Sequence, residues 1–109
     1  MDAVKDKLYD LIQAVKDSPE YQNFEKYKYE LNKNYDLRRR VDDYRRICYS
    51  MQQSGEDLYD KSDDLMREFS DLFANSTSHE FLMAESSVCR MIREICIALS
   101  REIDVDITL

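Results

Sequence analysis

The sequence predicts an all-α protein. It contains one glycine and one proline in 109 residues, whereas turns and hairpins of β-proteins depend on these two residue types. Apolar residues recur at intervals of three and four, which is the spacing of a helix face. The hydrophobic content of 43% is that of an ordinary folded protein. We expect a single domain over residues 1–109, with about five helices in an antiparallel or irregular bundle. A long third helix and an apolar C-terminal helix, through which the chain dimerises, complete this prediction.

The first two helices are predicted over residues 2–16 and 19–32. The first has an apolar stripe at Val4, Leu8, Leu11, Ile12 and Val15. Ser18 can accept hydrogen bonds from the free N–H groups at the start of the second helix, and Pro19 suits its first position, where no N–H is needed. The second helix is expected to turn Tyr21, Phe24 and Leu31 inward.

The third helix is predicted over residues 35–53, with Asn34 as its cap. Its inward face consists of Leu37, Val41, Tyr44, Cys48 and Met51. The intervals between these residues are four, three, four and three, which is a heptad seam over two repeats. The segment around Gly55, the only glycine, is the clearest predicted loop.

The last two helices are predicted over residues 57–74 and 77–102. Thr77 and Glu80 have the spacing of a capping box in front of an apolar run. From Phe81 to Leu99, 13 of 19 residues are apolar, so this helix is either central or buries a second face against another chain. The residues expected at that interface are Val88, Met91, Ile92, Ile95 and Leu99. The tail 103–109 alternates apolar and polar residues, which favours an extended segment that either follows a groove or frays.

No catalytic, cofactor or metal site is predicted. One histidine, His79, excludes a di-iron bundle, and Cys48, Cys89 and Cys96 lack the close pairing of zinc ligands. We expect these cysteines to be reduced and to serve as small apolar core residues. The acidic run near Asp57 does not have the pattern of a calcium loop. A net charge of −7 disfavours membrane surfaces and nucleic acid, and a cytoplasmic location is expected.

The best candidate for a charged binding surface is the arginine segment, residues 38–46. Asp42 and Asp43 lie between its first three and last two arginines, at the i,i+4 spacing of helical ion pairs. Three interpretations remain: an ordinary solvated helix face, a docking patch for an acidic partner, or an RNA-binding face. The residues assigned to partner docking are Arg38, Arg39, Arg45, Arg46 and Tyr35. Tyr29 and Tyr35 lie off the apolar stripe and are further interface candidates.

One series of short motifs has the pattern of a known family. It consists of Ser18-Pro19-Glu20-Tyr21-Gln22, an aromatic residue at Phe24, Leu31 ahead of Asn34-Tyr35-Asp36-Leu37, and Val41 with Tyr44-Arg45. In this order and spacing the chain resembles the YlbF/YmcA/YheA family over about Leu8 to Glu102. The resemblance implies an all-helical, oligomeric, non-enzymatic protein of the bacterial cytoplasm. Some members act with ribonuclease Y in mRNA processing and affect competence, sporulation and biofilm formation.

Those members carry C-terminal cysteines associated with an iron–sulfur cluster. This sequence has no such tail, so a YheA-like member without a cofactor is the closer comparison. The leading hypothesis is a non-catalytic regulatory or adaptor protein whose partners are itself, other regulator subunits or a ribonuclease. The alternative hypothesis is an RNA-associated factor that binds through residues 38–46.

Overall fold

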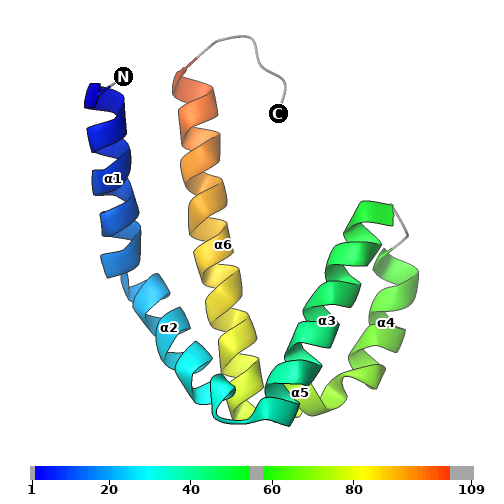
Figure 1. Cartoon of the computed structure of the whole chain (residues 1–109). Helices are drawn as coiled ribbons and strands as arrows, with labels where there is room; N and C mark the ends of the chain where they lie inside the picture. Colours follow the sequence, from blue (N-terminus) through cyan, green and yellow to red (C-terminus); the bar gives the residue numbers. More distant parts are fainter. Residues whose placement is uncertain (1, 55–57, 104–109) are drawn as a thin grey trace. The chain divides into compact units, whose positions relative to one another are not determined.

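The computed structural model describes residues 2–54 and 58–103, with residues 58–62 described by their backbone alone (Figure 1). The all-α prediction is confirmed, because every element in these residues is a helix. The elements are α1 (Asp2–Asp17), α2 (Pro19–Asn32), α3 (Tyr35–Ser54), α4 (Leu58–Glu68), α5 (Ser70–Ala74) and α6 (Ser76–Glu102).

Two predicted helix starts are confirmed by their capping hydrogen bonds. The backbone N–H of Tyr21 donates to Oγ of Ser18 over 3.2 Å, and α2 begins at Pro19. The backbone N–H of Leu37 donates to Oδ1 of Asn34 over 3.1 Å, and α3 begins at the next residue, Tyr35. Short polar side chains therefore set both boundaries by accepting from N–H groups that have no partner inside the helix.

The helix predicted over residues 57–74 is divided at Phe69 into α4 and α5, and residue 57 lies outside the described residues. Phe69 leaves the helical conformation, with φ −109° and ψ 25°, and its side chain is fully buried. The break thus directs a large aromatic ring into the core. Neither glycine nor proline marks it, so the sequence carried no local signal for it.

The start of α6 corrects the predicted capping box of Thr77 and Glu80. The cap is Asn75, whose Oδ1 accepts from the backbone N–H groups of Thr77 and Ser78 at 2.9 and 3.2 Å. The buried Ser78 hydroxyl then donates back to the carbonyl of Leu72. Because the side chain of Asn75 caps the helix, α6 begins at Ser76, earlier than a cap at Thr77 would predict. The predicted extended tail lies outside the described residues from residue 104 onward.

The chain divides into two compact units, which are described separately. The first, here called the core unit, is residues 25–82. Its α5 contacts both α3 and α4. Its buried apolar side chains are Leu31, Val41, Met51, Phe69, Leu72 and Phe81. The inward face predicted for α3 is confirmed, because Val41 and Met51 are buried and Leu37, Tyr44 and Cys48 are half-buried.

The second unit, here called the paired-helix unit, comprises residues 1–24 and 83–109. It contains α1, the start of α2 and most of α6. No residue of α1 is buried, and α6 has no buried residue after Val88. A single domain over residues 1–109 and its dimerisation remain predictions.

Candidate functional site

The apolar stripe of α1 is exposed along the whole helix. Val4 is 70% exposed, and Leu8, Leu11 and Ile12 are also exposed, with only Val15 half-buried. A helix of 16 residues is marginal in water by itself and depends on packing of its apolar face. Within the described residues that packing is missing, so α1 has an apolar face without a partner.

The five residues predicted for the interface on α6 fall into three groups by burial. Val88 is buried in this chain and is not accessible to a partner. Met91 and Ile95 are half-buried, while Ile92 and Leu99 are exposed, Leu99 by 54%. Ile97 and Ile103 are also exposed and were not among the predicted residues. Ile97 lies within the apolar run from Phe81 to Leu99, so its hydrophobicity could have indicated it, whereas Ile103 follows the end of α6.

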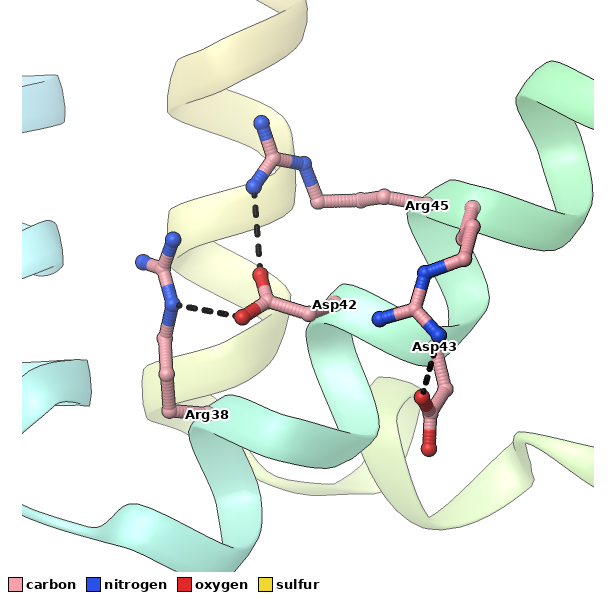
Figure 2. A network of polar contacts seen from close by, with 5 residues as sticks. Arg38, Asp42, Asp43 and Arg45 are labelled. Carbon is pink, nitrogen blue, oxygen red and sulfur yellow. Dashed lines mark hydrogen bonds and ion pairs between the residues drawn. The ribbon is translucent and has the colours of Figure 1, made fainter.

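In the arginine segment of α3, Arg38 and Arg45 share one aspartate (Figure 2). The carboxylate of Asp42 bridges two guanidinium groups, with Nε of Arg38 and Nη1 of Arg45 each 3.3 Å from one of its oxygens. Both guanidinium groups also lie over the ring of the buried Phe81, 5.3 and 5.8 Å from its centroid. These are cation–π distances, so Arg38 and Arg45 help to hold the start of α6.

Arg40 makes a similar arrangement with the break between α4 and α5. Its guanidinium lies 4.4 Å from the centroid of Phe69, and its Nη2 donates to Asp71 over 2.7 Å and to the carbonyl of Glu68 over 3.0 Å. The hydrogen bond from Arg40 holds the pKa of the Asp71 carboxyl below its ordinary value. Arg40 thus donates a hydrogen bond to a backbone carbonyl at the point where the helix is interrupted. The sequence alone had grouped Arg40 with the candidate charged binding surface.

Two arginines of the segment remain directed outward. Arg39 is exposed, and Arg46, with 75% of its side chain exposed, pairs with Asp43 over 3.4 Å. Tyr35 is 77% exposed at the start of the same helix. Of the five residues predicted for partner docking, Arg39, Arg46 and Tyr35 therefore stay accessible, while Arg38 and Arg45 pack on Phe81.

Tyr44 has an environment unlike that of the exposed tyrosines. Its ring meets those of Phe69 and Phe73 edge-on, with centroids 5.4 and 5.5 Å away. Burial, together with the neighbouring Cys48 side chain and its hydrogen bond, raises the pKa of Tyr44 to about 12. The phenol therefore stays protonated at neutral pH and acts as a packing residue.

The cysteines differ from the expectation of core residues. Cys48 is half-buried beside Tyr44, but Cys89 and Cys96 are exposed. The prediction was wrong for these two because α6 has no buried residue after Val88, where only Met91 and Ile95 are half-buried. Among those residues, no group of three or more His, Cys, Asp and Glu side chains is placed to bind a metal ion. Nor does any described helix combine the length and apolar character needed to cross a membrane.

Comparison with known proteins identifies the family. The family described as "Control of competence regulator ComK, YlbF/YmcA" matches residues 4–104. No curated protein and no solved structure matches the chain. Because the match spans nearly all of the sequence, the chain belongs to the YlbF/YmcA family, whose members take part in controlling the competence regulator ComK. The family prediction is confirmed, and the YheA-like subtype remains a prediction.

Proposed function

We propose that this YlbF/YmcA-family chain is a non-catalytic regulatory or adaptor protein that works by binding protein chains, beginning with a second copy of itself. The description of the family as a control of ComK supports the regulatory role. Other regulator subunits or a ribonuclease are the further partners, as the family resemblance implies. We place this activity in the cytoplasm and assign it no cofactor.

One observation carries the proposal: the paired-helix unit leaves its apolar faces uncovered. The whole of α1 has no buried residue, and α6 has none after Val88. Large contiguous apolar surfaces on soluble proteins mark interaction sites. A regulator that acts by association needs such a surface, and a surface on helices can be covered by helices of another copy.

The spacing of the two stripes favours self-association. The α1 stripe of Val4, Leu8, Leu11 and Val15 has intervals of four, three and four. The α6 stripe of Val88, Ile92, Ile95 and Leu99 repeats the same intervals. Heptad seams pack against each other in bundles, and a two-fold axis would place two copies of each stripe in one interface. The accessible part of the α6 stripe begins after Val88.

The RNA-binding alternative is supported less well. Arg38, Arg40 and Arg45 are held by aromatic rings and carboxylates, and Arg46 pairs with Asp43. A face with so few available cations would neutralise few phosphates, and phosphate contacts supply most non-specific affinity.

Sedimentation velocity over a range of protein concentrations tests self-association. The double variant Ile92→Glu with Ile95→Glu places two carboxylates on the α6 stripe and should reduce the sedimentation coefficient to that of a monomer at micromolar concentration. The matched control is Ser86→Glu with Arg90→Glu, which adds two carboxylates to the polar stripe of the same helix and should sediment like the unaltered protein.

A strictly monomeric unaltered protein at these concentrations would refute self-association. Far-UV circular dichroism checks that the variants remain helical. If the α6 variant unfolds, Val4→Glu with Leu8→Glu provides a second test, because α1 contributes no buried residue to the chain. Should this variant keep the mass of the unaltered oligomer, the proposed role of α1 would be wrong.

A further inference from the structure

The outward side of α3 carries a row of aromatic and cationic residues. Tyr35, Arg39, Arg46 and Tyr49 follow one another at intervals of four, seven and three, so they lie along one side of the helix. All four are exposed, with Tyr49 exposed by 64%. We call these four residues the outer α3 row. Tyr49 was not among the residues predicted for docking, although its helical spacing from Arg46 would have indicated it.

Other residues of α3 hold the helix in place through their contacts within the core unit. Val41 and Met51 are buried, and Arg38, Arg40 and Arg45 are each fixed on a phenyl ring and a carboxylate. These contacts all lie within the core unit. The outer α3 row therefore sits on a helix that is already ordered, and a partner would lose little affinity to ordering its backbone.

The chemistry of the row matches that of protein interfaces. Tyrosine and arginine are enriched among the residues that contribute most to binding energy. Arg39 forms no ion pair with any residue in 2–54 or 63–103. Arg46 has only the exposed pair with Asp43, and exposed pairs are readily exchanged for another carboxylate. Two cations thus stand seven residues apart, which is about 10 Å along a helix.

We propose that the outer α3 row binds an acidic α-helix of a partner protein, which presents two carboxylates about two turns apart to Arg39 and Arg46 and apolar side chains to Tyr35 and Tyr49. The site goes beyond self-association, because it uses α3 rather than α1 and α6. A chain of net charge −7 that displays arginines on this face is suited to such a partner by local charge complementarity. RNA is disfavoured as the occupant because the row offers only two cations, which would neutralise few phosphates.

The test uses synthetic 21-residue helical peptides and the ¹⁵N-labelled full chain. The first peptide carries two Glu residues seven apart, flanked by Leu, and in the second peptide Lys replaces both Glu residues. We expect the Glu peptide alone to shift the amide resonances of residues 35–49. Its Kd should rise at least about tenfold for Arg39→Glu with Arg46→Glu, which corresponds to about 1.4 kcal/mol. The control Arg90→Glu with Arg101→Glu makes the same charge change on α6 and should keep the original Kd.

Circular dichroism checks the fold of the α3 variant, and Arg39→Gln with Arg46→Gln replaces it if the charge reversal disrupts the helix. Several results would overturn the proposal. These are no shift with 1 mM Glu peptide, equal affinity for the Lys peptide, or equal loss in the α6 control. A change in sedimentation of the α3 variant would instead assign the row to a second copy, and binding of a single-stranded RNA that displaces the peptide would assign it to nucleic acid.

Discussion

The core unit and the paired-helix unit use apolar residues in opposite ways. In the core unit, Phe69 and Phe81 are almost completely buried and carry guanidinium groups over their rings. In the paired-helix unit, Leu8 and Leu99 are exposed on helices that are just as regular. The difference shows that the first unit buries its large apolar residues within this chain, whereas the second leaves such residues exposed. We propose that another chain covers them.

Substitution of Phe69 by Ala should have the largest effect on stability. Phe69 is 1% exposed, and truncation of such a ring costs about 3–5 kcal/mol because it leaves a cavity. Leu8→Ala, a truncation in α1, should cost less than about 0.5 kcal/mol in dilute solution, because Leu8 is exposed there. Urea unfolding followed by circular dichroism at low protein concentration measures both values. Equal losses for the two variants would erase the contrast between the units.

Substitution of Asp42 by Asn should have an intermediate effect. The change keeps the shape of the side chain but removes the charge that lies between Arg38 and Arg45. The two guanidinium groups over Phe81 would then repel each other, and stability should fall by about 1 kcal/mol, which is modest because the pairs are partly exposed. The control is Asp43→Asn, which removes only the exposed pair with Arg46 and should be nearly neutral. If both variants lose the same stability in urea, Asp42 has no special role in holding α6.

Alkaline pH should reveal an effect no larger than that of Asp42→Asn, through Tyr44. Its pKa is about 12 in the folded chain and about 10 when unfolded, so the unfolded state loses the phenol proton first as pH rises. The resulting stabilisation is complete below pH 10 and is lost as pH rises to about 12. It amounts to about 1 kcal/mol after allowance for partial exposure. Urea titrations from pH 8 to 12 should show a weaker pH dependence for Tyr44→Phe and an unchanged one for the exposed control Tyr49→Phe. An unchanged slope for Tyr44→Phe would contradict the assignment.

Helices and helix caps could be predicted from the sequence where the residues responsible lie close together in the chain. Ser18 and Asn34 act within three residues, and the inward face of α3 follows from its spacing. The break at Phe69 could not be predicted from the sequence, because it accompanies burial of the Phe69 ring in the core and is not marked by a glycine or proline. Likewise, the sequence placed the arginines on one helix but could not show which side Phe69 and Phe81 would occupy. Only tertiary contacts separate the packed Arg38, Arg40 and Arg45 from the outward Arg39 and Arg46.

The exposed state of Cys89 and Cys96 illustrates the same limit. Apolar character alone predicts burial, but it does not say whether the covering surface comes from the same chain or from another. The large number of apolar residues in α6 predicted an interface. Which of these residues a partner can reach depends on which ones the chain itself buries. Val88 is covered, and Ile92 and Leu99 are not.

Hydrogen exchange of α1 as a function of protein concentration shows whether a second chain stabilises the paired-helix unit. Amide protection in residues 2–17 should be low in the dilute protein and should rise with concentration in parallel with the oligomer fraction measured by sedimentation. Protection of buried core-unit residues such as Val41 and Leu72 should stay constant over the same range. If α1 is equally protected at concentrations where the chain is a monomer, the paired-helix unit is stabilised by its own chain and the account is contradicted.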